Sequence, residues 1–233
     1  TLAEIGGIDP LYKTGQVRWY KKPTKGHTYI VSLDPSLGTG SDPAAIQVIE
    51  LPECQQIAEW QHNKTIVQRQ VTLMKDICQA IYEETRDETG IYYSVENNTL
   101  GEAALVSISE LGEENIKGIF LSEPGKIGTS RRYRKGFNTS NKSKLSACAK
   151  FKNLIETKKM SIASRPLISE LKTFVAHGPS YAAKPGETDD LVMATLLVVR
   201  MMQQLSTYLI DVENQIKDFD EFLPPLPFYA ILG

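Results

Sequence analysis

The chain has 233 residues, of which 41% are hydrophobic and 23% are charged, and its formal net charge is -2. These values are ordinary for a globular protein with a substantial core, and no apolar run approaches the roughly 18 residues that a membrane-spanning helix requires. The three cysteines, Cys54, Cys78 and Cys148, are widely spaced. This spacing favours reduced thiols in a cytosolic setting over a disulfide framework or a zinc site.

The first 62 residues predict mainly β-structure. Glycine and proline punctuate residues 1–27, which we expect to form a lead-in segment on the domain edge with one short strand over 17–20. Runs rich in β-branched residues predict strands over 28–33, 44–51 and 55–62. Because short loops connect these strands, they predict an antiparallel meander.

From residue 64 the apolar period becomes helical and predicts a helix over 64–89, which Gly90 ends. A strand over 91–96, a helix over 99–111 and a short strand over 118–121 follow in the prediction. A meander followed by alternating strands and helices predicts an α/β fold. Its mixed sheet combines the antiparallel meander with parallel strands and carries helices on both faces.

The second half is predicted to be mainly helical. Residues 124–141 lack an apolar period and predict a long surface loop. Helices are expected over 142–158 and 166–176, and a loop over 178–186. Residues 189–208 are apolar on most faces and predict a buried helix.

We expect one domain over 28–210, preceded by the lead-in segment 1–27. Residues 211–233 are acidic and then proline-rich, and predict a tail that packs on the domain or trails from it. The sequence begins with Thr1 rather than Met, which indicates an excised part of a longer protein.

Acidic residues occur where predicted elements end or begin. Asp34 ends the first strand of the meander, Glu96 ends the strand over 91–96, and Asp189 and Asp190 begin the buried helix. Ligand sites in α/β sheets lie beyond the carboxyl ends of the strands, so we expect Asp34 and Glu96 to converge there. Clustered carboxylates require either a bound proton or a divalent cation. Ligands that are all oxygen favour Mg²⁺ or Mn²⁺ over zinc.

Each acid also has a structural interpretation. Asp34 is a suitable first residue of a proline-containing turn, and Glu96 resembles an ordinary loop acid. Asp189 is a suitable N-cap of the buried helix. Asp42 lies beyond a flexible loop through Gly38 and could reach the same metal, but capping that loop is its favoured role. For the other acids, their joint occurrence favours the metal.

Three segments resemble, in order and context, the acidic motifs of the C-terminal nuclease domain of tailed-phage large terminases, closest to the T-even type. They are LDPSLGTGSD, YYSVENN and GETDDLVMATLLVVR, and the resemblance extends through SNKSKLSACAKFKNLIETKKMSI to cover about residues 28–205. It implies an RNase H-like fold and a metal-dependent endonuclease that cuts concatemeric double-stranded viral DNA with little sequence specificity. The implied cofactor is one or two Mg²⁺ or Mn²⁺ ions.

The resemblance assigns the catalytic triad to Asp34, Glu96 and Asp190, and Asp190 is favoured over Asp189. All four acids, with Asp42, are candidate metal ligands. The partners that it implies are double-stranded DNA, the ATPase motor domain of the same full-length protein, the portal and the small terminase subunit. The implied location is the host cytoplasm, with no membrane contact.

A basic stretch lies between the second and third acidic motifs. It contains seven cations and no acid: Lys126, Arg131, Arg132, Arg134, Lys135, Lys142 and Lys144. Such a stretch is commonly a solvated loop, but beside a nuclease site it predicts an edge that binds DNA phosphates. No motif for reading bases accompanies it, which fits low sequence specificity.

The phosphate-binding motif GxxxxGK[ST] of an ATPase motor is absent from the sequence, so ATP hydrolysis is not predicted for this chain. Two alternatives to a packaging nuclease stay open. One is another RNase H-like DNA nuclease, of the junction-resolvase or transposase type. The other is a non-catalytic DNA-docking module. The histidines His27, His62 and His177 are scattered and are interpreted as ordinary surface or turn residues.

Overall fold

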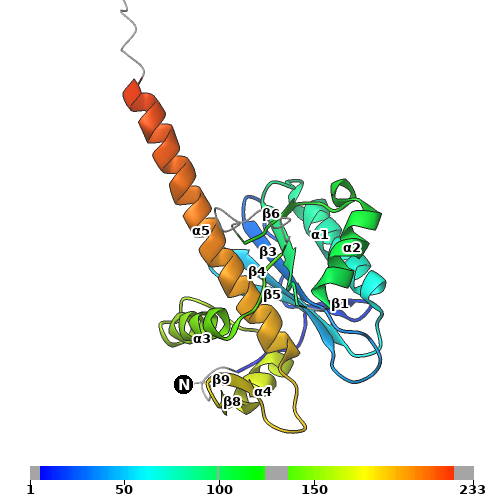
Figure 1. Ribbon diagram of the computed structural model, residues 1–233. Coiled ribbons are helices and arrows are strands. Elements are labelled where there is room, and N and C mark those ends of the chain that lie inside the picture. The colour runs from blue at the N-terminus through cyan, green and yellow to red at the C-terminus, as the bar shows by residue number, and fades with distance from the viewer. Residues whose placement is uncertain (1–5, 99, 124–135, 223–233) are drawn as a thin grey trace, which may run out of the picture. The chain divides into compact units, whose positions relative to one another are not determined.

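The computed structural model describes residues 6–98, 100–123 and 136–222, with side chains described as far as residue 206. The chain forms two compact units, Thr1–Met201 and Met202–Gly233. The first holds the sheet, its covering helices and the start of helix α5 (Asp190–Phe222), and the second holds the rest of α5 (Figure 1). No helix within the described ranges is long and apolar enough to cross a membrane.

The sheet has seven strands in the order β1-β2-β5-β4-β3-β6-β7. Their bounds are β1 (Tyr12–Thr14), β2 (Val17–Trp19), β3 (Thr28–Asp34), β4 (Ala44–Leu51), β5 (Gln55–His62), β6 (Ile91–Val95) and β7 (Ile119–Phe120). The predicted antiparallel meander is confirmed as β3, β4 and β5. Strand β6 runs parallel to β3 on its other side. The lead-in segment joins the sheet through β1 and β2, so it contributes two strands rather than one, with β1 at the edge.

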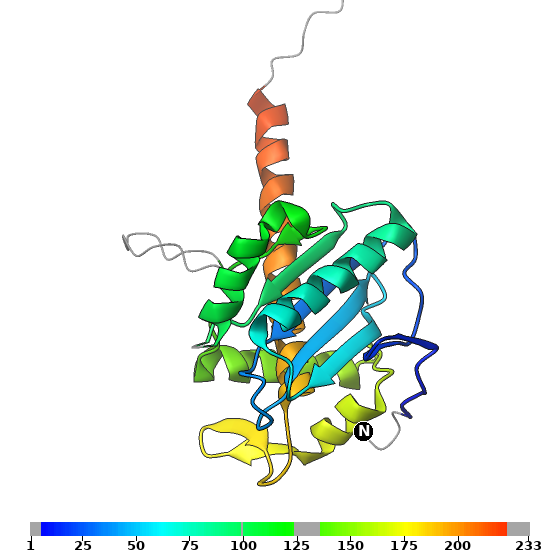
Figure 2. The same cartoon turned by 90° about the vertical axis from the view of Figure 1, so that its right-hand side faces the viewer.

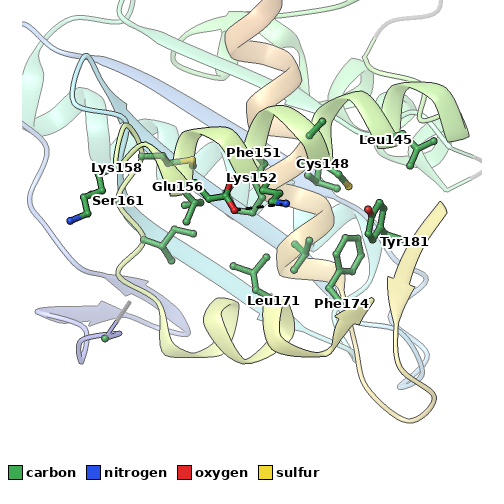
Figure 3. A pocket seen from close by; sticks show the side chains of 17 residues that line it. Leu145, Cys148, Phe151, Lys152, Glu156, Lys158, Ser161, Leu171, Phe174 and Tyr181 are labelled. Atoms are coloured by element: carbon green, nitrogen blue, oxygen red, sulfur yellow. Dashed lines mark ion pairs between the residues drawn. The ribbon is translucent and has the colours of Figure 1, made fainter. Parts of the chain in front are cut away.

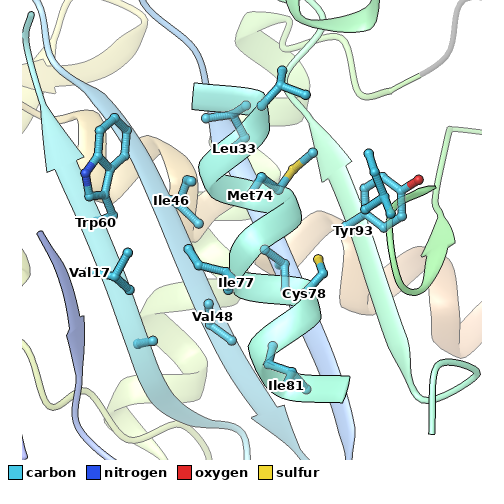
Figure 4. Packing of buried hydrophobic residues seen from close by; sticks show 14 of the residues in the cluster. Val17, Leu33, Ile46, Val48, Trp60, Met74, Ile77, Cys78, Ile81 and Tyr93 are labelled. Atoms are coloured by element: carbon cyan, nitrogen blue, oxygen red, sulfur yellow. The ribbon is translucent and has the colours of Figure 1, made fainter. Parts of the chain in front are cut away.

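Helices α1 (Val67–Thr85) and α2 (Gly101–Leu111) cover one face of the sheet (Figure 2). Alternate residues of β3, such as Val31 and Leu33, point to this face and pack with the apolar stripe of α1, including Met74 (Figure 4). Burying each such side chain contributes roughly 1.5–3 kcal/mol. This contiguous core fixes the register of β3 and β6, because a slip by one residue would turn their apolar side chains to the other face.

The opposite face of the sheet is buried but polar. Because side chains alternate along a strand, Ser32 and Asp34 of β3 point away from α1. The Ser32 hydroxyl donates to the carbonyl oxygen of Ala194 at 2.8 Å, so the first turns of α5 cover this face. Helices α3 (Asn141–Glu156) and α4 (Arg165–Thr173) lie on the same side. The strand geometry thus directs Asp34 toward the start of α5.

Two predictions for the second half are wrong. Residues 178–186 were expected to be a loop, but β8 (Phe174–His177) and β9 (Ser180–Ala183) form a hairpin. Gly178 has φ +57° at its turn, and the Phe174 and Tyr181 rings stack with centroids 6.0 Å apart. The predicted helix end at residue 208 is also wrong, because α5 continues to Phe222. Residues 209–222 contain no glycine or proline that would stop a helix.

Helix α1 also ends differently from the prediction. We expected Gly90 to stop it, but Arg86 takes the left-handed conformation with φ 60°. The Arg86 N–H donates to the carbonyl oxygen of Tyr82 at 2.7 Å and satisfies the last turn. The strand that follows, β6, therefore begins after a short turn and runs alongside β3.

Candidate metal centre

Asp34 and Glu96 lie side by side at the carboxyl ends of neighbouring parallel strands. The Glu96 N–H donates to the carbonyl oxygen of Leu33 at 2.9 Å, which continues the ladder one residue beyond β6. The two residues are 8% and 6% exposed, so two buried carboxyl groups lie next to each other at this edge of the sheet.

The environment of Asp34 opposes a negative charge. Burial raises the pKa of Asp34 well above its usual range, and the charge of Glu96 and the hydrogen bond with it raise it further. The charges of Asp190 and Asp189 act in the same direction. The apposition of these buried acids therefore needs a proton or a divalent cation between them.

Asp190 is the first residue of α5 and faces the same region. Burial, then the charges of Glu170 and Asp189, raise its pKa to about 7. Within the described part of the chain its carboxylate makes no hydrogen bond except to its own backbone. Asp42 is exposed, but its charge also raises the pKa of Asp190. The structure thus gathers all the predicted acids in one electrostatic group.

Asp189 points elsewhere. One of its carboxylate oxygens accepts the Ala183 N–H of β9 at 3.3 Å and lies 3.9 Å from the Lys144 Nζ of α3. The alternative in which the Asp189 side chain caps α5 is wrong, because its hydrogen bond goes to the hairpin. Only its backbone carbonyl joins the helix, by accepting the Met193 N–H at 2.7 Å. A paired Asp189 leaves Asp190 as the acid available to a cation.

Sequence reasoning missed Glu170 of α4. This buried carboxylate accepts the Val192 N–H in the first turn of α5 at 3.1 Å, and it is the largest charge influence on Asp190. A signal was present, because Glu170 lies three residues after Leu167 on the apolar face of a predicted helix. An acid on such a face needs buried partners.

The loop after Asp34, which was expected to be flexible, makes three contacts with neighbouring segments. The Gln70 side chain of α1 accepts the Ser36 N–H at 3.2 Å and donates to the Ser36 carbonyl oxygen at 2.8 Å. Gly40 and Asn63 exchange two hydrogen bonds of 2.7 and 3.0 Å. Between these anchors Gly38 lies directly against the backbone of residues 65 and 66. These contacts fix both ends of the loop, and its flexibility between them stays a prediction.

Replacing Gly38 with alanine is expected to lower both the melting temperature and DNA cleavage. A Cβ on Gly38 would lie 2.2 Å from the carbonyl oxygen of Thr65, and its φ of +71° is strained for alanine. The strain alone costs on the order of 1–3 kcal/mol. Gly15→Ala is the matched control, because Gly15 has φ +60° but no atom within 4 Å of such a Cβ. Equal thermal shifts in the two variants would contradict the packing argument.

The oxygen-rich donor set fits a hard divalent cation. Asp34, Glu96 and Asp190 supply only carboxylate oxygens, and Asp190 has no competing protein donor apart from its own backbone. These three do not place one oxygen each within 4.8 Å of one another. Because unscreened carboxylates repel, this separation is expected without a cation.

One trio of potential ligand atoms in the described ranges does lie within 4.8 Å: His27, Glu50 and Glu53. Glu50 already has protein partners, because Lys21 pairs with it and the Tyr29 hydroxyl donates to it at 2.8 Å. Burial would raise the pKa of Glu50, but these hydrogen bonds outweigh burial and lower it. Glu50 pairs with Tyr29 at the start of β3, whereas Asp34 ends that strand. Glu50 therefore already has protein partners, and the trio lies at the opposite end of β3 from Asp34.

A cavity of about 1070 Å³ lies between α3, α4, the hairpin and the first turns of α5 (Figure 3). Its wall is mainly apolar, with Leu145, Phe151 and Phe174 among the described lining residues, and none of the acids named above lines it. The cavity is therefore separate from the cluster of buried acids.

The structure places only two of the predicted DNA-binding cations. Lys142 and Lys144 lie in the first turn of α3, which Ser140 caps. The other five lie outside the described residues: Lys126, Arg131, Arg132, Arg134 and Lys135. The residues that flank this group are described. Phe137 bridges to Glu96, and the Asn97 N–H donates to the Phe137 carbonyl oxygen at 2.7 Å.

Arg200 of α5 contacts the described residues on both sides of the gap 124–135. Its guanidinium pairs with Glu123, donates to the carbonyl oxygen of Asn138 at 2.9 Å and to the Thr139 hydroxyl at 2.9 Å. It also lies over the Phe137 ring, 5.3 Å from the centroid. The described residues on either side of 124–135 therefore lie next to Glu96.

The sequence of residues 31–201 matches the family described as terminase RNaseH-like domain. This segment contains all five predicted acids and the whole basic stretch.

Solved structures resemble the chain at low sequence identity. The large terminase nuclease of the thermophilic phage G20c with bound magnesium is 16% identical and has a TM-score of 0.61, over 85% of this chain and 94% of that chain. The large terminase nuclease domain of Thermus phage P74-26 is 16% identical, with a TM-score of 0.59, over 84% and 90%. The human cytomegalovirus terminase nuclease domain is 14% identical, with a TM-score of 0.54, over 75% and 82%. These similarities confirm the RNase H-like fold.

Proposed function

Because the chain belongs to the family of terminase RNaseH-like domains, we propose that it is a metal-dependent endonuclease that cuts concatemeric viral DNA during packaging. The observation that carries the proposal is the buried pair of Asp34 and Glu96 with Asp190 facing it. Such a pair adds nothing to stability without a cation or a proton. The finer resemblance to the T-even type remains a prediction.

Asp34, Glu96 and Asp190 would hold the divalent cation, with Asp42 and Asp189 as accessory acids. When bound, such an ion lowers the pKa of coordinated water and neutralises charge on the phosphodiester. Asp34 and Glu96 hold their carboxyl groups at a fixed separation because the β3–β6 ladder joins their backbones. Lys144 pairs with Asp189, which keeps that carboxylate turned toward the hairpin.

Mg²⁺ is the proposed physiological ion, with Mn²⁺ as a substitute, because every proposed ligand is a carboxylate oxygen. The G20c terminase nuclease, which shares the fold, has been solved with magnesium, with cobalt and with zinc. These relatives support a divalent cation as the cofactor, and the donor chemistry supports the choice of magnesium.

Double-stranded DNA is the proposed substrate, held by the basic stretch 126–144. The support is that this stretch joins the domain beside Glu96 and that Lys144 lies beside Asp189. We also propose that the chain acts in the host cytoplasm with an ATPase motor domain, the portal and the small terminase subunit. ATP hydrolysis is not proposed for this chain.

Cleavage of supercoiled plasmid tests the proposal. We expect nicked and linear products in Mg²⁺ or Mn²⁺ and none with EDTA, without a requirement for ATP. A marked preference for four-way junctions over plasmid would instead identify a junction resolvase. If neither DNA is cleaved and neither metal raises the melting temperature, the chain is a docking module.

Neutralising the basic stretch should weaken DNA binding without changing metal binding. Changing the five cations between 126 and 135 to glutamine is expected to reduce the slope of log K against log salt by roughly 0.9 for each DNA phosphate that the protein no longer neutralises. Fluorescence anisotropy with a duplex at several salt concentrations measures this slope. The charge-matched control changes five exposed lysines elsewhere: Lys13, Lys22, Lys25, Lys150 and Lys159. An equal decrease in both variants would show only a general charge effect.

A further inference from the structure

Glu170 links the sheet to the helix that carries Asp190. Its side chain is 7% exposed and lies on α4, between β5 and the start of α5. One oxygen accepts Gln61 Nε2 of β5 at 2.7 Å and the Thr188 hydroxyl at 3.0 Å. The other oxygen accepts the Val192 N–H at 3.1 Å.

These contacts give Glu170 the role of an N-cap supplied from another helix. The first N–H groups of a helix have no partner within the helix, and an acceptor near them is stabilised by the helix dipole. The side chain of Asp189, which precedes the helix, turns to the hairpin, and that of Asp190 reaches only its own backbone, so the Val192 N–H depends on Glu170. Glu170 therefore fixes the turn from which Asp190 projects.

All three partners of Glu170 are donors: an amide, a hydroxyl and a backbone N–H. A buried carboxylate with three donors suits an anchor, because its oxygens hold β5 and α5 at one distance from each other. The Asp34 strand is separated from β5 only by β4. Glu170 thus connects Gln61 of the sheet to the first turn of α5. This connection sets the position of Asp190 relative to Asp34.

We propose that Glu170 is a positioning residue for Asp190: it holds the first turn of α5 in place, so that the Asp190 side chain can join Asp34 and Glu96 around one divalent cation. This inference rests on the proposed function, since it takes Asp190 as a metal ligand. Glu170 touches neither metal nor DNA. Its effect on cleavage passes through the placement of Asp190.

The test compares three variants in the metal-free and Mn²⁺-bound domain. Glu170→Ala removes the anchor, and Glu170→Gln keeps an acceptor for the Val192 N–H. Leu171→Ala perturbs the same helix on its cavity-lining side and removes no hydrogen bond to α5. Three readouts are required: hydrogen exchange at the Val192 amide without metal, Mn²⁺ affinity by titration calorimetry, and the dependence of plasmid cleavage on Mn²⁺ concentration.

In Glu170→Ala we expect faster exchange at Val192 and Mn²⁺ affinity weaker by about tenfold or more, the range found when groups that orient metal ligands are removed. Cleavage at saturating Mn²⁺ should recover more than cleavage at low Mn²⁺. Glu170→Gln should regain most of the affinity. Leu171→Ala should lower the melting temperature and leave the affinity unchanged.

Unchanged Mn²⁺ affinity in Glu170→Ala, or an equal decrease in Leu171→Ala, would overturn the positioning role. The outcomes separate this inference from the proposed function. A wild-type domain that binds Mn²⁺ but cleaves no DNA refutes the nuclease and leaves the comparison of affinities decisive for Glu170. A wild-type domain that binds no Mn²⁺ overturns both.

Discussion

Replacing Asp34 with asparagine is expected to reduce plasmid cleavage by about a thousandfold or more, equivalent to ~4 kcal/mol of transition-state stabilisation. At the same time the melting temperature of the metal-free domain should rise. The reason for both is the same. Asp34 is buried against Glu96, with Asp190 and Asp189 adding negative charge, so the folded chain without metal bears an electrostatic penalty. Asparagine removes that penalty and removes a ligand.

The fold of Asp34→Asn should be intact. The asparagine amide can donate a hydrogen bond to the neighbouring Glu96 carboxylate, while the β3–β6 ladder is unaffected. Circular dichroism, thermal unfolding in EDTA and initial rates of nicking in Mg²⁺ measure the three effects. Asp76→Asn is the matched control, because Asp76 is an exposed acid on α1. It should leave both rate and stability unchanged.

A gain in stability with a loss of activity distinguishes a functional acid from a structural one. If Asp34 were only a turn residue, its replacement would lower the melting temperature and leave cleavage nearly intact. Full activity in Asp34→Asn would remove the basis for the proposed function. If the variant loses both stability and activity, Mn²⁺ affinity decides between the two roles: a turn residue leaves the affinity unchanged, and a metal ligand does not.

The sequence predicted the parts of the fold that depend on local pattern. Apolar runs rich in β-branched residues predicted β3, β4 and β5, and the approach of Asp34 and Glu96 follows from adjacent strand ends. Residue types could not show which segments, distant in the sequence, supply hydrogen-bond partners to the loop after Asp34 and to the start of α5. Gln70 lies 34 residues from the loop at Ser36 that it fixes. Glu170 caps a helix that begins 20 residues later along the chain.

The hairpin β8–β9 shows the same limit. Phe174 ends a stretch with helical periodicity, so local pattern extended the predicted helix through residue 176. The ring stack of Phe174 on Tyr181 and the left-handed Gly178 favour the hairpin instead. The hairpin in turn provides the Ala183 N–H that holds Asp189. A feature that the sequence pattern did not reveal thus decides which of the two adjacent aspartates faces the other acids.

Adding Mg²⁺ is expected to stabilise the domain, and to do so more strongly at about pH 8 than at about pH 5. At a concentration of 100 times Kd, binding contributes about 2.7 kcal/mol, which corresponds to about 5–10 °C for a chain of this size. The pH dependence follows from the acids. The folded pKa of Asp190 is raised from 3.8 to about 7, and that of Asp34 is raised in the same direction.

An acid with a raised folded pKa stabilises the metal-free chain fully below its unfolded pKa, and this contribution disappears as the pH rises through the folded pKa. For Asp190 that window runs from 3.8 to about 7. Metal binding requires the deprotonated carboxylates, so affinity for Mg²⁺ rises over the same window. Melting temperatures with Mg²⁺ and with EDTA across this range measure both trends.

Asp190→Asn should flatten the pH dependence, whereas Asp76→Asn should retain it. Because protons and metal compete for one set of oxygens, a Mg²⁺ shift that is equal at both ends of the range would mean that the ion binds somewhere other than at these acids.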